Sequence, residues 1–494
     1  MEAEIRKSFW SYLDALSVAS QDTSVSNTKS GKIKLYDFVN TAEQRHEFLE
    51  LAHVTRFFFE HDSAKKNTDD SWQEAIHNYF CQSGIYRDIV NKNQFNVDSA
   101  YSNYRSSFTK KASTTLYLAP LDLVSIETAK TSLDFGSFKI RRFSSTEFST
   151  LTRNYINTIF YNYSAFTKEQ IDLLSKYWYI YTENSELNKE IGTFLLPGSA
   201  ITTLIFTGKA ERRFTEFPKS IESALRSLCL FDWSELESKS IKVGRWSSKK
   251  NWASLRLFQI PFVLEISGDL HSAPERKPDI TNLTKQSFTD VDTDKEYEEP
   301  EHWSFIEHDK VDQFVSFVTE YNDILNRLKI REHNWDFLDL ALGYFMKAFF
   351  IEPSLERMLW YICSFESLAG ESGFGVTKRL SERLGKILNR EIGFKDEDVQ
   401  TRFNDIYSLR NSLVHGGKFK QQAMSTDLLD SYIMARHTIL WFLHILDDTE
   451  TAISNKKVQS NEVPGREEIL SLLDLGRTSR RRMHSLLDNI PGKL

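Results

Sequence analysis

The stretch Asp405-Ile-Tyr-Ser-Leu-Arg-Asn-Ser-Leu-Val-His-Gly-Gly417 combines a helix, the end of that helix and three polar side chains. The paired glycines stand where a left-handed helix stop is expected. They therefore place His415 in the last helical turn, where the helix dipole favours a protonated imidazole. We take Arg410, Asn411 and His415 as the candidate catalytic residues and work outward from them.

These three side chains suit the chemistry of a phosphodiester. An arginine holds a phosphate by two hydrogen bonds and stabilises charge as it develops, and a histidine moves protons near neutral pH. Asn411 and His415 are four residues apart and share a helix face. Arg410 points about 140° away from His415 around an ideal helix. We therefore expect either an unwound helix end or a site shared between two copies of the chain.

The spacing of Arg410 and His415 carries little weight alone. An arginine followed by a histidine four to six residues later occurs three more times, at Arg56 and His61, Arg327 and His333, and Arg480 and His484. A structural alternative also stands: Arg410 forms a salt bridge with Asp405, and His415 only caps the helix end. The amphipathic helix before the motif and the glycines after it favour a site.

The C-terminal region resembles the HEPN superfamily, and within it the Apea-like group. The resemblance covers about residues 335–447 and rests on Leu359-Trp-Tyr-Ile-Cys-Ser-Phe-Glu-Ser-Leu368, Lys378-Arg-Leu-Ser-Glu-Arg-Leu384 and Tyr407-Ser-Leu-Arg-Asn-Ser-Leu-Val-His-Gly416. It implies a helical bundle that dimerises and cleaves RNA without metal, by attack of the ribose 2′-OH. It also implies that Arg410 and His415 of two subunits meet in one cleft, in a toxin–antitoxin or antiviral defence system. A non-catalytic bundle that serves dimerisation or ligand binding is the alternative.

Two further residues are predicted to support the motif. Glu366 lies on an otherwise apolar helical stripe, so we expect it to reach the motif and orient Arg410; the alternative is a boundary residue that faces solvent. Tyr407 lies one turn before Arg410 and is either a supporting residue or part of the core.

Basic residues on a neighbouring helix suggest a contact with RNA. They follow the spacing i, i+4, i+7 and i+11, which lines one helix face: Arg379, Arg383, Lys386 and Arg390. Phosphate contact is one interpretation and a solvated face is the other. The cluster Arg477, Arg480, Arg481 and Arg482 near the end of the chain has the same two interpretations.

Patterning along the 494 residues predicts an α+β protein with several domains. We expect a mixed α/β sensing or positioning region over 1–270, possibly two subdomains, then an acidic linker over 271–302. An all-α, HEPN-type helical bundle over 303–450 and a basic helical tail over 451–494 follow. Within the first region, 91–112 reads as loop, and Ser144 with Glu147 forms a capping-box pattern that starts a helix.

Composition narrows the class of protein. A net charge of −7 argues against non-specific coating of nucleic acid but leaves room for a local basic site. The three cysteines are far apart and match no metal or redox spacing, and neither a secretory signal nor a membrane span is evident. We expect a soluble cytoplasmic protein with no cofactor and no metal. Its expected partners are RNA, a second copy of the chain and an antitoxin or trigger protein.

Overall fold

The structure is a computed structural model of the whole chain. It describes residues 2–22, 38–39, 41–60, 68–94, 96–109, 112–156, 166–187, 217–233, 258–267, 280–289, 294, 296–351, 354–371, 375–414, 424–455 and 463–475.

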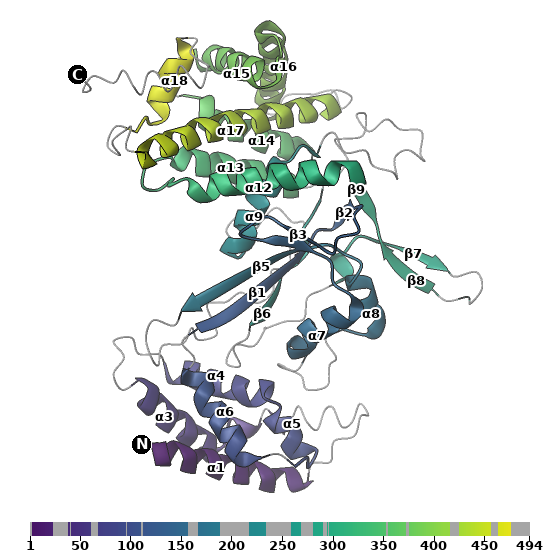
Figure 1. The fold of residues 1–494 in the computed structure, drawn as a ribbon, viewed down its shortest axis with the longest axis vertical. Coiled ribbons are helices and arrows are strands. Elements are labelled where there is room, and N and C mark those ends of the chain that lie inside the picture. The colour runs from purple at the N-terminus through teal and green to yellow at the C-terminus, as the bar shows by residue number, and fades with distance from the viewer. Residues whose placement is uncertain are drawn as a thin grey trace. The chain divides into compact units, whose positions relative to one another are not determined.

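The chain divides into two compact units that interleave in sequence. Unit 1 comprises residues 1–120, 140–206 and 260–300, and unit 2 comprises 121–139, 207–259 and 301–494. Unit 2 therefore takes two segments from the region that was predicted to end at residue 270. Helices and a smaller set of strands occur together, which confirms the α+β class (Figure 1).

The first part of unit 1 is a helical cluster with an aromatic core. Its elements are α1 (Glu2–Ala19), η1 (Ser20–Asp22), α3 (His46–Glu60), α4 (Asp69–Gln82), α5 (Ile85–Val90) and α6 (Val97–Thr109). Phe9, Tyr12, Phe80 and Tyr104 are fully buried at its centre. The Tyr12 and Tyr86 hydroxyls lie 2.7 Å apart, so the buried phenols satisfy one another's hydrogen bonds.

Helix α6 corrects the expectation of a loop over 91–112. The many Asn, Ser and Lys residues there suggested a loop, but Tyr101, Tyr104 and Phe108 recur at helical spacing and are buried against the cluster. The Asn96 side chain accepts a hydrogen bond from the Ser99 backbone at 2.9 Å, which satisfies an N–H of the first turn. Aromatic burial therefore outweighs the weak helix propensity of the polar residues.

The second part of unit 1 is a sheet covered by two helices. Strands β4 (Lys139–Arg141), β5 (Tyr179–Leu187), β1 (Ala112–Pro120) and β6 (Leu264–Ser267) lie side by side in this order. β1 pairs antiparallel with both neighbours, with Leu118 opposite Tyr181 and Leu264. Helices α7 (Ser145–Ile156) and α8 (Lys168–Leu174) add Phe148 and Leu174 to its core.

The capping box predicted at Ser144 is confirmed. The Glu147 backbone N–H donates to Ser144 Oγ at 3.2 Å, and the Ser144 N–H donates to Glu147 Oε2 at 3.0 Å. Thr167 and Gln170 form a second capping box at the start of α8, which the sequence analysis missed. Both boxes satisfy backbone donors that a helix start leaves open.

The acidic stretch 271–302 is more than a linker. Its described residues include η5 (Ile280–Asn282) and the antiparallel strands β7 (Lys285–Thr289) and β8 (Glu296–Pro300). The Phe288 and Tyr297 rings stack at 5.7 Å, and Lys176 of α8 pairs with Glu299 at 2.7 Å. The aromatic contact across the two strands and the ion pair from α8 therefore order a segment whose composition suggested none.

Unit 2 consists mainly of packed helices, with a few short strands. Its elements are β2 (Leu123–Ile126), β3 (Ser132–Asp134), α9 (Lys219–Leu230), β9 (His302–Ile306), η6 (His308–Lys310), α12 (Val311–Arg327), α13 (Asp336–Phe350), α14 (Ser354–Ala369), α15 (Val376–Ile392), α16 (Asp396–Val414), α17 (Met424–Ser454) and α18 (Arg466–Asp474). The helices expected over 303–450 and the helix after Pro464 are all present. Among the described residues, no helix is long and apolar enough to span a bilayer.

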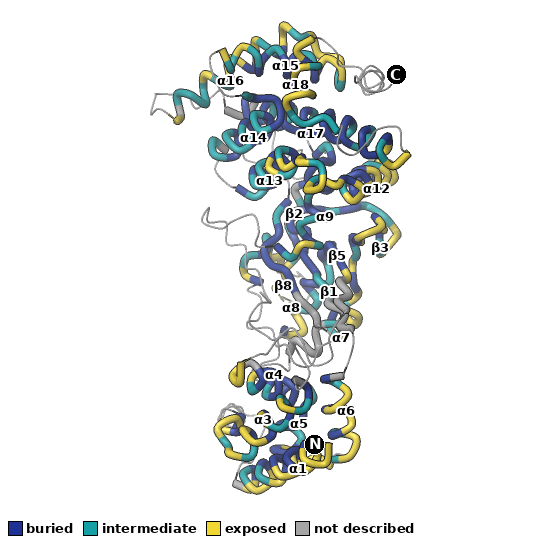
Figure 2. Tube along the Cα trace, turned by 90° about the vertical axis from the view of Figure 1, so that its left-hand side faces the viewer, coloured by how far each residue is buried: buried dark blue, intermediate teal, exposed yellow. Residues whose placement is uncertain are grey.

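Helix α17 is the centre of this unit. Its 31 residues pack against α12, α13, α14 and α15, and it is largely buried (Figure 2). Tyr432 of α17 is fully buried, and its ring lies 5.7 Å from Phe345 of α13 and 5.6 Å from Tyr361 of α14. This core fixes α14, the helix that carries Glu366.

Candidate active site

Helix α16 carries the Arg410 motif, and its sequence explains its position. Asp396, Glu397 and Asp398 begin the helix and complement its dipole. Val399, Phe403 and Ile406 are buried at helical spacing, and the Phe403 ring packs edge-on against Phe365 of α14 at 6.0 Å. This anchor places the C-terminal half of α16 beside the last turns of α14.

Glu366 of α14 joins the two helices at the motif. The Tyr407 hydroxyl donates to Glu366 Oε1 at 2.8 Å, and Arg410 Nη2 lies 4.0 Å from Glu366 Oε2. The Glu366 side chain is 23% exposed and that of Arg410 is 28% exposed. One carboxylate therefore faces both candidates on α16, at the border between core and solvent.

Arg410 has two more contacts on its own helix. Its guanidinium carbon lies 5.4 Å from the centre of the Tyr407 ring, and Nη1 donates to Asn411 Oδ1 at 3.2 Å. Its ion pair within the described part of the chain is with Glu366, not with Asp405 as the structural alternative supposed. Glu366, Tyr407, Arg410 and Asn411 therefore form one cluster, which we call the Arg410 cluster.

Burial and charge keep the neighbours of Arg410 protonated. Burial raises the pKa of the Tyr407 phenol to about 12, and the hydrogen bond to Glu366 adds to this effect. Burial also raises the pKa of the Cys363 thiol, with Glu366 contributing in the same direction. At neutral pH, Tyr407 is thus a hydrogen-bond donor and Cys363 is a thiol, not a thiolate nucleophile.

His415 lies outside the described residues, as do Gly416 and Gly417. The described part of α16 ends at Val414, whose side chain is exposed. The geometry between His415 and Arg410, and the predicted glycine stop, stay predictions.

Of the three other Arg–His matches, the pair at 327 and 333 is fully described, and its residues have structural partners. Arg327 donates to both carboxylate oxygens of Asp447, at 2.9 and 3.0 Å. His333 Nε2 lies 3.0 Å from a Glu450 oxygen, and both side chains are buried. His61 and the pair Arg480 and His484 lie outside the described residues.

The basic residues of α15 do not form the open stripe that was predicted. Arg383 is 2% exposed and donates to Ala369 O, Glu371 and both oxygens of Asp474, so it is unavailable to RNA. Lys386 Nζ donates to the Leu473 and Asp474 carbonyls, and Arg379 pairs with Glu371. Arg390 is exposed. The stripe mainly holds α18, because Arg383 and Lys386 lie against that helix; Arg477 and Arg480–Arg482 lie outside the described residues.

Helix α18 contributes a residue that the sequence analysis missed. Arg466 Nε donates to the carbonyls of Ser367 at 2.8 Å and Leu368 at 3.1 Å, and Nη2 donates to the Gly370 carbonyl. The Ser367 and Leu368 carbonyls belong to the last turn of α14, beside Glu366, where a helix leaves its carbonyls without a partner of its own. No sequence signal links Arg466 to α14, because about a hundred residues separate them.

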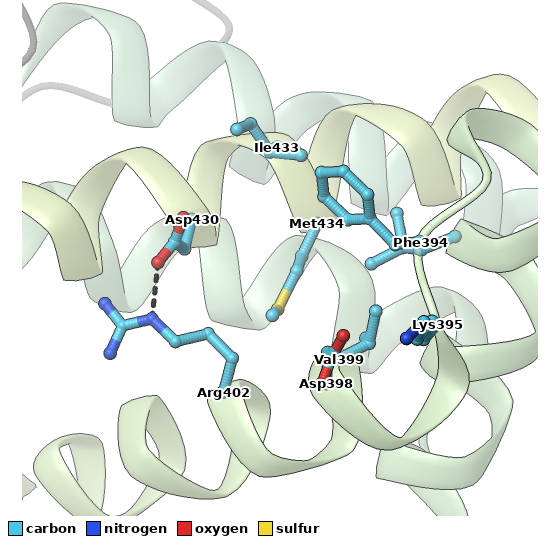
Figure 3. Close-up of a pocket in the computed structure, with 9 residues that line it drawn as sticks. Phe394, Lys395, Asp398, Val399, Arg402, Asp430, Ile433 and Met434 are labelled. Atoms are coloured by element: carbon cyan, nitrogen blue, oxygen red, sulfur yellow. Dashed lines mark hydrogen bonds and ion pairs between the residues drawn. The ribbon is translucent and has the colours of Figure 1, made fainter.

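A cavity of about 300 Å³ lies elsewhere on α16 (Figure 3). Its apolar wall includes Phe394, Val399 and Met434, and its rim includes Arg402, which pairs with Asp430 of α17. Arg402 precedes Arg410 by eight residues, about 12 Å along a helix. The cavity is therefore separate from the Arg410 cluster.

Comparison of the chain with family models, with curated proteins and with solved structures finds no match. Within the described ranges, no three His, Cys, Asp or Glu side chains gather in a way that holds a metal ion.

Proposed function

We propose that the chain is a metal-independent endoribonuclease of HEPN type. The observation that carries the proposal is the position of Arg410: half-exposed, facing Glu366 and five residues before His415. Its separation of 4.0 Å from Glu366 is longer than a close charge-assisted hydrogen bond. In the described part of the chain, Arg410 donates one of the five hydrogen bonds available to a guanidinium, so it has N–H groups left to bind a phosphate.

The reaction assigns one role to each residue. His415 removes the proton from a ribose 2′-OH, whose oxygen attacks the adjacent phosphorus, and it returns that proton to the 5′-oxygen of the next nucleotide as this oxygen leaves. Arg410 binds the non-bridging oxygens and stabilises the charge that develops on them. Glu366 and Tyr407 hold Arg410, and Asn411 fixes one of its nitrogens. The products are a 2′,3′-cyclic phosphate and a free 5′-OH.

Cleavage of single-stranded RNA in EDTA tests the proposal. We expect wild-type protein to leave cyclic phosphate ends, and Arg410→Ala and His415→Ala to abolish cleavage. Arg331→Ala is the matched control, because Arg331 is exposed in the turn between α12 and α13 and lies in the same unit. An inert wild type, or variants at 410 and 415 that cut as well as wild type, contradicts the nuclease.

We further propose that the working form is a homodimer that shares its site across a two-fold axis. A mixture of the Arg410→Ala and His415→Ala proteins then regains about a quarter of wild-type activity, because half the dimers are mixed and each has one intact site. If each site instead lies within a single chain, the mixture of the two variants stays inactive. This outcome separates a shared site from a site that one α16 completes alone.

The role that fits such an enzyme is a toxin or antiviral-defence effector in the cytoplasm, restrained by an antitoxin or trigger protein. Expression of the wild type is then toxic, and expression of Arg410→Ala is not. The competing function is a non-catalytic dimerisation or ligand-binding module. The ion pair of Arg410 with Glu366 favours this alternative if its role is only to join α14 to α16. The EDTA assay distinguishes the two functions.

A further inference from the structure

A second cluster on α14 shares with the Arg410 cluster a glutamate, an aromatic ring and a cation. Trp360 Nε1 donates to Glu356 Oε1 at 3.4 Å, and Lys347 Nζ of α13 lies 3.5 Å from the centre of the Trp360 ring. The Tyr344 ring lies 5.4 Å from that of Trp360, at an angle of 31°. Each of these side chains is half-buried. We call this group the Trp360 cluster.

The correspondence between the clusters is chemical and positional. Each has a glutamate of α14 that accepts a hydrogen bond from an aromatic side chain, Glu356 from Trp360 and Glu366 from Tyr407. In each, a cation from a neighbouring helix lies against that aromatic ring. The two glutamates are ten residues apart, about 15 Å along the helix axis.

Cys363 lies between the two clusters along α14, three residues after Trp360 and three before Glu366. Burial and the charge of Glu366 raise the pKa of the Cys363 thiol, whereas Arg410 and Lys347 both act to lower it. The charges of both cations therefore act on the same thiol. Trp360, Cys363 and Glu366 are each half-buried, and each is three residues from the next, a spacing at which residues are neighbours on a helix surface.

Aromatic rings alternating with cations are typical of surfaces that bind single-stranded nucleic acid. The rings stack on bases of any sequence, and the cations follow the phosphates. The ammonium of a lysine binds a phosphate as a point charge, without the geometric demands of a guanidinium.

We propose that Lys347, Trp360 and Tyr344 form a second subsite for single-stranded RNA, which binds nucleotides flanking the phosphodiester held at Arg410. Lys347, which covers one face of the Trp360 ring, contacts a backbone phosphate, and a base packs against the ring surface of Tyr344 and Trp360 that Lys347 leaves uncovered. The subsite deepens the proposed nuclease function and rests on it for the identity of the strand. It positions substrate and takes no part in proton transfer.

Binding of a fluorescent 2′-O-methyl oligonucleotide, about ten nucleotides long and single-stranded, tests the subsite. This probe lacks the attacking hydroxyl, so it reports binding whether or not the protein cleaves RNA. We expect Lys347→Gln and Trp360→Leu each to raise Kd about tenfold. Lys378→Gln is the matched control, because the Lys378 side chain is 82% exposed on α15, and we expect its Kd to equal that of wild type.

The salt dependence of Kd separates the phosphate contact of Lys347 from the base stacking of Trp360. The slope of log Kd against log salt concentration falls by about 0.7 in Lys347→Gln, because one phosphate contact is lost. Trp360→Leu weakens binding and leaves the slope unchanged, because a stacked base releases no counterion. If Trp360→Leu does not fold, Trp360→Phe retains a ring, and Lys347→Gln still reports the phosphate contact.

The subsite is overturned if Lys347→Gln binds the probe with the Kd and salt slope of wild type, or if wild type does not bind at all. Weaker binding in Lys347→Gln supports the subsite even if the protein does not cleave natural RNA. In that event only the nuclease proposal is wrong. If Arg410→Ala abolishes cleavage but Lys347→Gln binds the probe like wild type, the subsite proposal is wrong and the nuclease proposal stands.

Discussion

The Tyr407 hydroxyl donates a 2.8 Å hydrogen bond to Glu366, and the other oxygen of that carboxylate faces Arg410 at 4.0 Å. Tyr407 is also the ring against which Arg410 lies. The three side chains therefore form a closed set across α14 and α16, in which the position of Arg410 depends on a residue 44 places earlier in the sequence.

Replacing Glu366 by Gln tests that dependence. Gln keeps an oxygen that accepts the Tyr407 hydrogen bond but removes the charge that faces Arg410. We expect kcat for RNA cleavage to fall about tenfold, equal to about 1.4 kcal/mol of transition-state stabilisation. The pKa of Tyr407 falls below its value of about 12 and stays above the ordinary value, because burial is its largest cause.

Two measurements on the Glu366→Gln protein check these effects. Single-turnover cleavage gives the change in the chemical step, and NMR of carbon-labelled tyrosine, assigned by comparison with Tyr407→Phe, gives the pKa. Glu382→Gln is the control, because Glu382 is half-buried on α15 and faces Lys378 instead of the site. Unchanged cleavage in Glu366→Gln means that Arg410 is held by α16 alone.

The sequence predicted the members of the Arg410 cluster better than their contacts. A glutamate on an apolar stripe indicated that Glu366 faces something other than open solvent, and its partners Tyr407 and Arg410 lay in the recognisable motif. The role of Arg383 was unpredictable, because helical spacing places four cations on one face and says nothing of what covers that face. Asp474, which covers it, lies 91 residues later.

Helices with one wide apolar stripe, such as α12 and α15, were predictable because burial of that stripe decides their structure. Helix α6 and the β7–β8 hairpin were not predicted, because their polar composition was given more weight than their few aromatic residues. These residues are Tyr104 and Phe108 in α6, and Phe288 and Tyr297 in the hairpin. The interleaving of the two units follows from tertiary contacts, which no local pattern encodes.

Arg466 is predicted to act on the site through the end of α14. It donates to the Ser367 and Leu368 carbonyls beside Glu366, so Arg466→Ala releases the turn that carries this carboxylate. We expect kcat to fall about tenfold with KM nearly unchanged, and Arg466→Lys to recover part of the loss, because an ammonium replaces some of the donors of the fork.

A double-mutant cycle with Glu366→Gln identifies the route of this effect. If Arg466 acts through Glu366, its replacement costs little activity once Glu366 has already lost its charge. Equal losses in both backgrounds show instead that Arg466 only stabilises the fold, which urea unfolding reports separately.

His77 makes the helical cluster of unit 1 sensitive to acid. Its side chain, on α4, is 18% exposed; Nδ1 lies 3.6 Å from Glu43 Oε2 and 3.4 Å from the Tyr86 hydroxyl, and Nε2 lies 3.5 Å from Cys81 Sγ. Burial lowers the pKa of His77 to about 4, so the imidazole is neutral in the folded protein at neutral pH. The unfolded chain binds a proton at the ordinary pKa of about 6.5.

Because the folded pKa is depressed, the stability that neutral His77 contributes is present above pH 6.5 and is lost as pH falls towards 4. The full shift corresponds to a loss on the order of 3 kcal/mol.

We expect hydrogen exchange of the α4 amides, corrected for intrinsic rates, to accelerate between pH 7 and 5 in wild type and much less in His77→Gln. The α17 amides are the internal control, because burial also lowers the pKa of His437 to about 4 and the substitution leaves that residue untouched. If α4 in His77→Gln keeps the wild-type response to acid, the sensitivity belongs to another group, such as Glu43, whose carboxylate lies 3.6 Å from the imidazole.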